Sequence, residues 1–178
     1  VRYAGYNSTL SYRGNIAVRN AATLNLHNST LSHSSTYGLQ LYQTTGAVQV
    51  TNNTIESNNS YGVYADNSSH NAILENNQIS GSNNHGIFSQ NSALVLVNNS
   101  LSDNNGSGLS VTGTILPSLS GNEISDNSTA AVFLSPASTD LAVDATNTID
   151  TPLHVGSSSL ASDVTWSNER VYYLTGSL

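Results

Sequence analysis

Two acidic residues have a spacing in this sequence that could support metal chemistry. Asp103 and Asp126 each lie two residues after an apolar residue, and Asn104 and Asn127 follow them directly. Carboxylate and amide oxygens are the ligands that Ca²⁺ prefers. If equivalent residues of successive repeats stack, the two carboxylates lie about 5 Å apart and form a candidate calcium site. The alternative, which we favour, is a pair of aspartates that stabilise tight turns.

Aromatic residues form a second candidate site. Tyr37, Tyr61 and His85 each come just before a glycine, whereas Tyr64 and Phe88 come two residues after one. The residues beside Tyr64 and Phe88 are apolar and should point inward, so these two rings should point outward and form an exposed stack. Exposed flat rings bind sugars or a partner's surface, which predicts ligand binding by Tyr61, Tyr64, His85 and Phe88. The alternative, which we favour, is ring stacking that only stabilises the fold.

A repeat of about 24 residues must position both sets of side chains. An apolar residue recurs at steps of 24, 24, 22, 23 and 25, as Leu31, Ile55, Ile79, Leu101, Ile124 and Ile149. A small residue recurs at steps of 24, 24, 24, 22 and 23, as Gly14, Gly38, Gly62, Gly86, Gly108 and Ala131. Two independent columns with the same step indicate a stack of structural repeats.

Within each repeat, apolar residues alternate over a few positions, as in Val48/Val50 and Leu94/Leu96. Such alternation predicts short, half-buried strands, and the Asn, Ser and Gly residues between them suit tight corners. One coil cannot bury its own apolar face, so the coils must stack, with each strand parallel to its copy. The predicted fold is all-β: a single-stranded parallel β-helix, or β-solenoid, of about seven coils of 22–25 residues.

An asparagine column supports this prediction. One asparagine per coil occupies the same position in five coils, as Asn53, Asn77, Asn99, Asn122 and Asn147, and Ser29 holds that position in the coil before. In a stack, each side-chain amide can donate to the carbonyl of the next coil, which gives a structural ladder at a corner.

The repeat also divides the chain. We expect residues 1–20 to form an irregular first coil, residues 21–150 to form the regular coils, and residues 151–178 to form a degenerate final coil and the start of a further segment. Pro117 replaces an apolar strand residue, which predicts a distorted strand there. Leu141 and Val143 look one position out of register, which predicts a bulge or slip.

Composition excludes several classes of function. The 178 residues carry a net charge of −7 with four Arg and no Lys, which argues against nucleic-acid binding. No apolar run is long enough to span a membrane. Cysteine is absent, so no disulfide or thiolate metal site can form. The first residue is not Met and no signal peptide is visible, so we expect a processed product or an excerpt of a longer protein.

The spacing Asn-x-Ile followed by Gly-Ile or Gly-Val resembles the parallel β-helix repeats of pectate-lyase-like proteins and of many bacterial surface proteins. Residues 1–5 and the segment from Trp166 to Gly176 are similar to short sequence segments of large secreted β-helix proteins. The repeat resemblance covers roughly residues 14–150. It implies a right-handed coil, an extracellular or cell-surface location, and a place in a tandem array.

The resemblance does not carry an activity. Lyases of this fold need calcium-binding aspartates and an Arg or Lys base, and hydrolases need closely placed aspartates. No Arg lies in the coils of Asp103 and Asp126, so we predict no catalytic residue and lean away from an enzyme. The first hypothesis is a non-catalytic structural module of an extracellular fibre, sheath, stalk or adhesin, which associates end to end with copies of itself or with neighbouring modules. The alternative is a carbohydrate-binding or polysaccharide-degrading protein with glycans as ligands.

Overall fold

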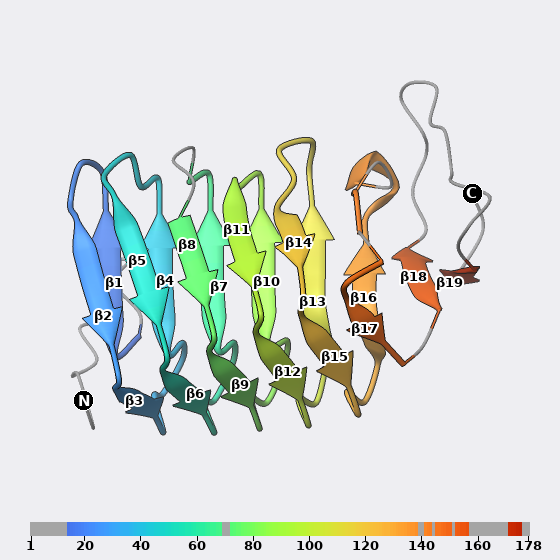
Figure 1. Ribbon diagram of the computed structural model, residues 1–178, viewed down its shortest axis with the longest axis horizontal. Coiled ribbons are helices and arrows are strands. Elements are labelled where there is room, and N and C mark those ends of the chain that lie inside the picture. The colour runs from blue at the N-terminus through green and yellow to red at the C-terminus, as the bar shows by residue number, and fades with distance from the viewer. Residues whose placement is uncertain are drawn as a thin grey trace.

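The computed structural model describes residues 14–68, 72–138, 141–143, 145–150, 152–156 and 171–175. These residues form a stack of coils whose sides are three parallel sheets (Figure 1). In this part of the chain, the one helical segment is a 3₁₀ turn, η1 (Pro136–Ser138). The predicted all-β, parallel β-helix is therefore confirmed.

Each sheet collects one strand from each successive coil. The eight-stranded sheet contains, in order, β1 (Ile16–Arg19), β4 (Leu39–Tyr42), β7 (Val63–Asp66), β10 (Ile87–Gln90), β13 (Ser107–Thr112), β16 (Ala130–Leu134), β18 (Leu153–Gly156) and β19 (Tyr172–Thr175). The five-stranded sheet contains β2 (Leu24–His27), β5 (Val48–Thr51), β8 (Ala72–Glu75), β11 (Leu94–Val97) and β14 (Ser118–Ser120). The six-stranded sheet contains β3 (Thr30–Ser32), β6 (Thr54–Glu56), β9 (Gln78–Ser80), β12 (Ser100–Ser102), β15 (Glu123–Ser125) and β17 (Thr148–Ile149).

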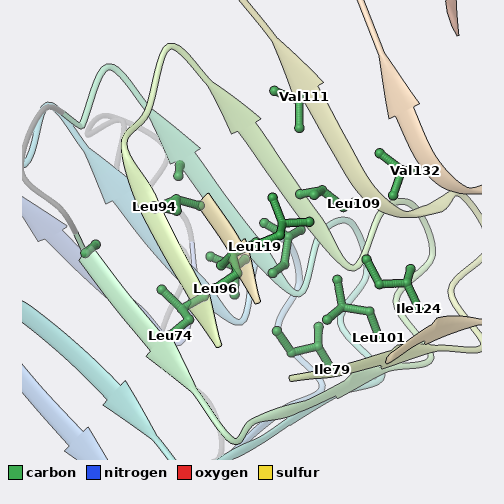
Figure 2. Close-up of a cluster of buried hydrophobic side chains, with 14 of the residues drawn as sticks. Leu74, Ile79, Leu94, Leu96, Leu101, Leu109, Val111, Leu119, Ile124 and Val132 are labelled. Carbon is green, nitrogen blue, oxygen red and sulfur yellow. The ribbon is translucent and has the colours of Figure 1, made fainter. Parts of the chain in front are cut away.

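The register of these strands follows the sequence repeat. Leu31 pairs with Ile55, and Ile55 pairs in turn with Ile79. The column continues through Leu101 and Ile124 to Ile149. Figure 2 shows that side chains from all three sheets point into one narrow interior, where they pack against each other. Burial of these Leu, Ile and Val side chains is the main force that stacks the coils.

The number of coils is smaller than predicted. The six-stranded sheet gives about six turns, not the seven that chain length divided by repeat length suggests. Among the residues described after the sixth turn, β18 and β19 both join the eight-stranded sheet.

Most strands end at a residue with a left-handed backbone, and this conformation makes the corners. The column after the six-stranded sheet has φ of 55° at His33, 52° at Ser57, 62° at Gly81, and 55° at both Asp103 and Asp126. The corners after the other two sheets use the same conformation at Asn20, Asn28, Gln43, Asn52, Asn67, Asn76, Asn91, Asn98, Gly113 and Gly121. Asn, Asp and Gly tolerate this conformation best, which explains their abundance in the sequence.

Both local irregularities predicted from the sequence are confirmed. β14 begins at Ser118, directly after Pro117, and is one residue shorter than its neighbour β11. Val143 bridges Leu119, an offset of 24 residues, whereas Ile149 pairs with Ile124, an offset of 25. The chain therefore has one more residue between Val143 and Ile149 than the coil before has between Leu119 and Ile124, which is the predicted slip. Leu141 and Val143 are nevertheless buried, so the additional residue is accommodated after them.

Candidate functional site

Five rings from three successive coils gather on the outer side of the eight-stranded sheet. Tyr64 and Phe88 are outward-facing residues of β7 and β10 and pair directly in the sheet register. Tyr37, Tyr61 and His85 lie at the corner where the chain enters β4, β7 and β10. All five side chains are half-buried. We call this group the aromatic stack, and it brings together all four residues predicted to bind a ligand.

The rings stack face to face along the axis of the solenoid. Tyr61 lies between Tyr37 and His85, with ring centroids 5.4 and 5.6 Å away and planes 18° and 6° apart. Tyr64 lies between Tyr37 and Phe88, at 4.7 and 5.6 Å, with planes 9° and 7° apart. The faces of Tyr61 and Tyr64 are therefore covered by other rings, and their edges are what remains towards solvent. A sugar binds to an aromatic residue mainly through the ring face, so this geometry favours stabilisation of the coils.

The outward column that contains Tyr64 and Phe88 is not exposed throughout. Gln40 and Ser110 occupy the same column in neighbouring coils, but their exposed fractions are only 4% and 2%. The sequence correctly predicts that this column faces away from the core. It does not predict that the short Ser110, between the much larger Phe88 and Phe133, is shielded from water.

Polar atoms at the edge of the stack are also engaged. The Tyr64 hydroxyl donates to Asp66 Oδ2 at 3.2 Å, and Asn67 Nδ2 donates to Asp66 Oδ1 at 2.7 Å. Burial, together with the negative charge of Asp66, raises the pKa of Tyr64 well above its ordinary value. Burial also raises the pKa of Tyr61, with a smaller contribution from Tyr37. Both shifts favour the protonated hydroxyl.

His85 has a structural role within the stack. Its Nδ1 accepts a hydrogen bond from the backbone NH of Ser107 at 2.9 Å, so the ring proton is on Nε2. Burial lowers the pKa of His85 because the charged imidazolium loses hydration. A neutral His85 therefore links the aromatic stack to the next coil.

The predicted calcium ligands are split between two environments. Asp103 and Asp126 are exposed and have left-handed backbones at the ends of β12 and β15. Asp103 Oδ2 accepts from Ser102 Oγ at 3.0 Å, and the backbone NH of Asp126 donates to Asp150 Oδ2 at 2.8 Å. These contacts are typical of aspartates in turns. Across the described residues, no three or more His, Cys, Asp or Glu side chains gather as a metal site would require.

Asn104 and Asn127, the other predicted calcium ligands, make a ladder of their own. The backbone NH and Nδ2 of Asn104 both donate to Asn127 Oδ1, at 3.1 and 3.0 Å. Asn104 Nδ2 also donates to the Ile79 carbonyl, and Asn127 Nδ2 donates to the Leu101 carbonyl. These amides point into a corner of the coil, where they satisfy backbone groups. The same column begins with Ser34, Asn58 and Ser82.

The ladder that the sequence does predict forms a continuous chain of hydrogen bonds. The backbone NH groups of Asn53, Asn77, Asn99 and Asn122 each donate to the side-chain Oδ1 one coil further on, at 2.9–3.0 Å. Their Nδ2 atoms donate to the same acceptors, at 2.9–3.0 Å, and the last acceptor is Asn147. Nδ2 of each ladder asparagine also donates to a backbone carbonyl of the preceding coil. The ladder therefore satisfies buried groups that the strands leave open at this corner.

The third corner carries a hydroxyl ladder that sequence reasoning missed. The backbone NH of Thr44 donates to Ser68 Oγ at 3.3 Å, and the backbone NH of Ser68 donates to Ser92 Oγ at 3.1 Å. The signal was present, because these residues recur at steps of 24. It was hidden by the large number of Ser and Thr residues elsewhere. Each corner of the coil thus has its own axial column of polar side chains.

Comparison with known proteins agrees with this geometry. A family model described as "Right handed beta helix region" matches residues 5–87 and residues 42–170. Searches of curated proteins and of solved structures gave no match. No helix in the described ranges is both long and apolar enough to cross a membrane. The matched ranges cover most of the sequence and include all six turns of the stack, and the chain therefore belongs to the right-handed β-helix family.

Proposed function

We propose that the chain is a non-catalytic structural module of an extracellular or cell-surface fibre, sheath, stalk or adhesin, and that it associates end to end. One observation supports this proposal: the polar and aromatic side chains that could bind a ligand or react instead contact their equivalents in the adjacent coils along the axis. The asparagine ladder joins consecutive coils by side-chain amides, and the rings of Tyr61 and Tyr64 are covered by rings of adjacent coils. Such arrangements favour length and stiffness over a reactive site.

A rigid module of this kind should resist proteases. Its strands lie in continuous parallel ladders, and cleavage needs local unfolding of the backbone that the ladders oppose. Digestion with thermolysin, which cleaves beside apolar residues, should leave a core that spans residues 14–138, and mass spectrometry would identify it. Rapid cleavage within β7 to β12 under native conditions would argue against a stiff structural role.

End-to-end association is the second property to test. Static light scattering of the chain over a range of concentrations should show a mean mass that rises with concentration, and electron microscopy should show rods of constant width. A strictly monomeric profile at every concentration and salt condition would contradict the proposed association.

Glycan binding is the second candidate function, and the half-exposed ring edges of the aromatic stack favour it. A glycan array would test the wild-type chain against a Tyr64→Ala/Phe88→Ala variant, with Ile73→Ala on the outer side of β8 as a control. Binding that is lost only in the ring variant would support this candidate. A second array with Ca²⁺ and an Asp103→Asn/Asp126→Asn variant would test the predicted calcium site.

A further inference from the structure

Charge is distributed very unevenly along the sequence. Residues 1–55 contain Arg2, Arg13 and Arg19 and no acidic residue, whereas residues 56–178 contain all eleven acidic residues and one Arg. In each sheet the strand order follows the sequence order, so position in the sequence corresponds to position along the axis. Figure 1 shows β1, β2 and β3 at one end of the long axis, and β18 and β19 at the other. Among the described residues, the one Arg therefore lies in the first coil and all the acidic side chains lie in later coils, which gives this part of the stack an electrical polarity.

Arg19 and three of the acidic residues lie near opposite ends of the described stack. Arg19 lies on β1, the first strand of the eight-stranded sheet, and its guanidinium carbon lies 4.6 Å from the Tyr42 ring centroid. Glu123, Asp126 and Asp150 are exposed and lie in the last two turns. We call the first coil, with β1, β2 and β3, the basic end, and the coils from β15 onward the acidic end.

The acidic end also carries an apolar surface. Of the four large apolar side chains that are exposed in the described part of the chain, two lie on β19 and one directly precedes it: Tyr173 and Leu174, with exposed fractions of 58% and 42%, and Val171, with 72%. β19 is the last described strand of its sheet, and Leu174 pairs with the buried Val155. An apolar terminal strand of a sheet favours pairing with another strand.

The alternation of inward-facing apolar residues on β1 matches that on β19. Ile16 and Val18 begin the same two inward-facing columns that Tyr172 and Leu174 end, because the register runs without a break from β1 to β19. A further parallel strand with the pattern of β1 would therefore place apolar residues above apolar residues. Ala17 would then lie above Tyr173.

We propose that copies of this chain add head to tail, with the basic end of one copy on the acidic end of the next and β1 beside β19. This inference rests on the proposed end-to-end association and adds its direction and its strand pair. Contact between two acidic ends is opposed by charge repulsion, whereas contact between unlike ends is attractive. Such a heterologous contact does not close on itself, so it gives open chains.

Charge-swap variants test the direction of assembly. An acid-start variant, Ala17→Glu/Asn25→Glu, makes both ends negative, and a base-end variant, Glu123→Gln/Thr148→Lys, reduces the negative charge at the other end. A control with two added negative charges in the middle, Asn76→Asp/Gln78→Glu, matches the acid-start variant in net charge. All six positions are exposed.

Sedimentation velocity at about 10 mM salt, where the Debye length is about 30 Å, should show association of the wild type and the control. The acid-start variant alone should associate about tenfold more weakly, because like charges then meet at the contact. An equimolar mixture with the base-end variant should recover association. At about 0.5 M salt these differences should shrink, because the charges are screened.

Disulfide trapping tests the strand pair, since the chain has no cysteine of its own. Adjacent parallel strands lie about 4.8 Å apart, which is within the range that a disulfide can bridge. A mixture of Ala17→Cys and Tyr173→Cys chains should form a mixed disulfide dimer under mild oxidation. Ala17→Cys with Gln78→Cys should form at least tenfold less.

The possible outcomes separate the two proposals. Association that ignores the charge swaps and gives no mixed disulfide would overturn the head-to-tail contact but leave end-to-end association intact. No association of the wild type under any condition would overturn both. Recovery in the mixture, together with the mixed disulfide, would establish both the direction and the strands.

Discussion

Removal of one interior member of the asparagine ladder should destabilise the whole stack. Asn99 is fully buried, and its Oδ1 accepts from the backbone NH and from Nδ2 of Asn77, both at 3.0 Å. Its Nδ2 donates to the Leu74 carbonyl at 2.8 Å and to Asn122 Oδ1 at 3.0 Å. The Asn99→Ala substitution removes all four hydrogen bonds.

The energetic cost of Asn99→Ala depends on which hydrogen-bond partners of Asn99 keep another hydrogen bond. Asn77 Nδ2 still donates to the Val50 carbonyl, and Asn122 Oδ1 still accepts from the backbone NH of residue 99. The backbone NH of Asn77 loses its acceptor, whereas the carbonyl of Leu74 remains within the parallel ladder of β8 and β11. An unsatisfied buried NH costs about 1–3 kcal/mol and the other lost bonds cost about 1 kcal/mol, so the free energy of unfolding should fall by about 2–4 kcal/mol.

Asn147→Ala is the matched control at the end of the ladder. Asn147 accepts from the backbone NH and Nδ2 of Asn122, but it is partly exposed, so water can replace its side chain. We expect this change to cost less than about 2 kcal/mol. Urea unfolding followed by circular dichroism would compare both variants with the wild type.

Hydrogen exchange gives a local measure of the same prediction. The backbone NH of Asn77 should exchange faster in the Asn99→Ala variant than in the wild type, because its acceptor is gone. The ladder would not be a significant source of stability if Asn99→Ala unfolded at the same urea concentration as Asn147→Ala. Unchanged exchange at Asn77 would lead to the same conclusion.

Three further predictions concern corners and rings. Gln43 has a φ of 51°, so Gln43→Gly should raise the free energy of unfolding by up to about 1 kcal/mol in urea titrations, and a loss would show that its side chain matters more than its backbone. Burial lowers the pKa of His85, so its contribution to the free energy of unfolding should be fully present above the unfolded pKa of 6.5 and be lost as the pH falls through the folded pKa. His85→Tyr should remove this pH dependence of the free energy of unfolding between about pH 7 and 5, although the backbone NH of Ser107 then loses its acceptor. Tyr64→Phe keeps the ring but loses the hydrogen bond to Asp66, so the free energy of unfolding measured by thermal unfolding should fall by about 1–2 kcal/mol. No change would show that this hydrogen bond is no stronger than the bond that the hydroxyl makes to water in the unfolded chain.

The fold was predictable because its main signal repeats. Ile55 and Ile79 pair in the structure as their 24-residue spacing predicts, and the asparagine column was visible because one residue type holds the same position in five coils. The coil count was too high because the estimate divided the whole chain by the repeat length, although the repeat itself weakens after residue 151.

The candidate sites were less predictable, because orientation is not encoded in spacing. The positions of Tyr61 and Tyr64 predict that rings meet, but which faces they cover depends on side-chain torsions. Asn104 looked like a metal ligand beside Asp103, yet its amide turns into the corner and satisfies backbone groups. Gln43 occupies a left-handed corner without the Asn or Gly that would have marked it.

The asparagine ladder also gives the stack a macrodipole. Each Oδ1 in the ladder accepts from the preceding coil, and one N–H of each Nδ2 donates to the Oδ1 of the following coil. The amide dipoles of the ladder therefore have a component along the axis in the same sense, with the negative pole at the first coil. Arg19 lies nearer that pole, and Glu123, Asp126 and Asp150 lie nearer the positive one. An α-helix is stabilised by charges placed in the same sense at its two ends. A β-solenoid with an amide ladder thus gains the electrostatic directionality of a helix, although its sheets contribute little net dipole of their own.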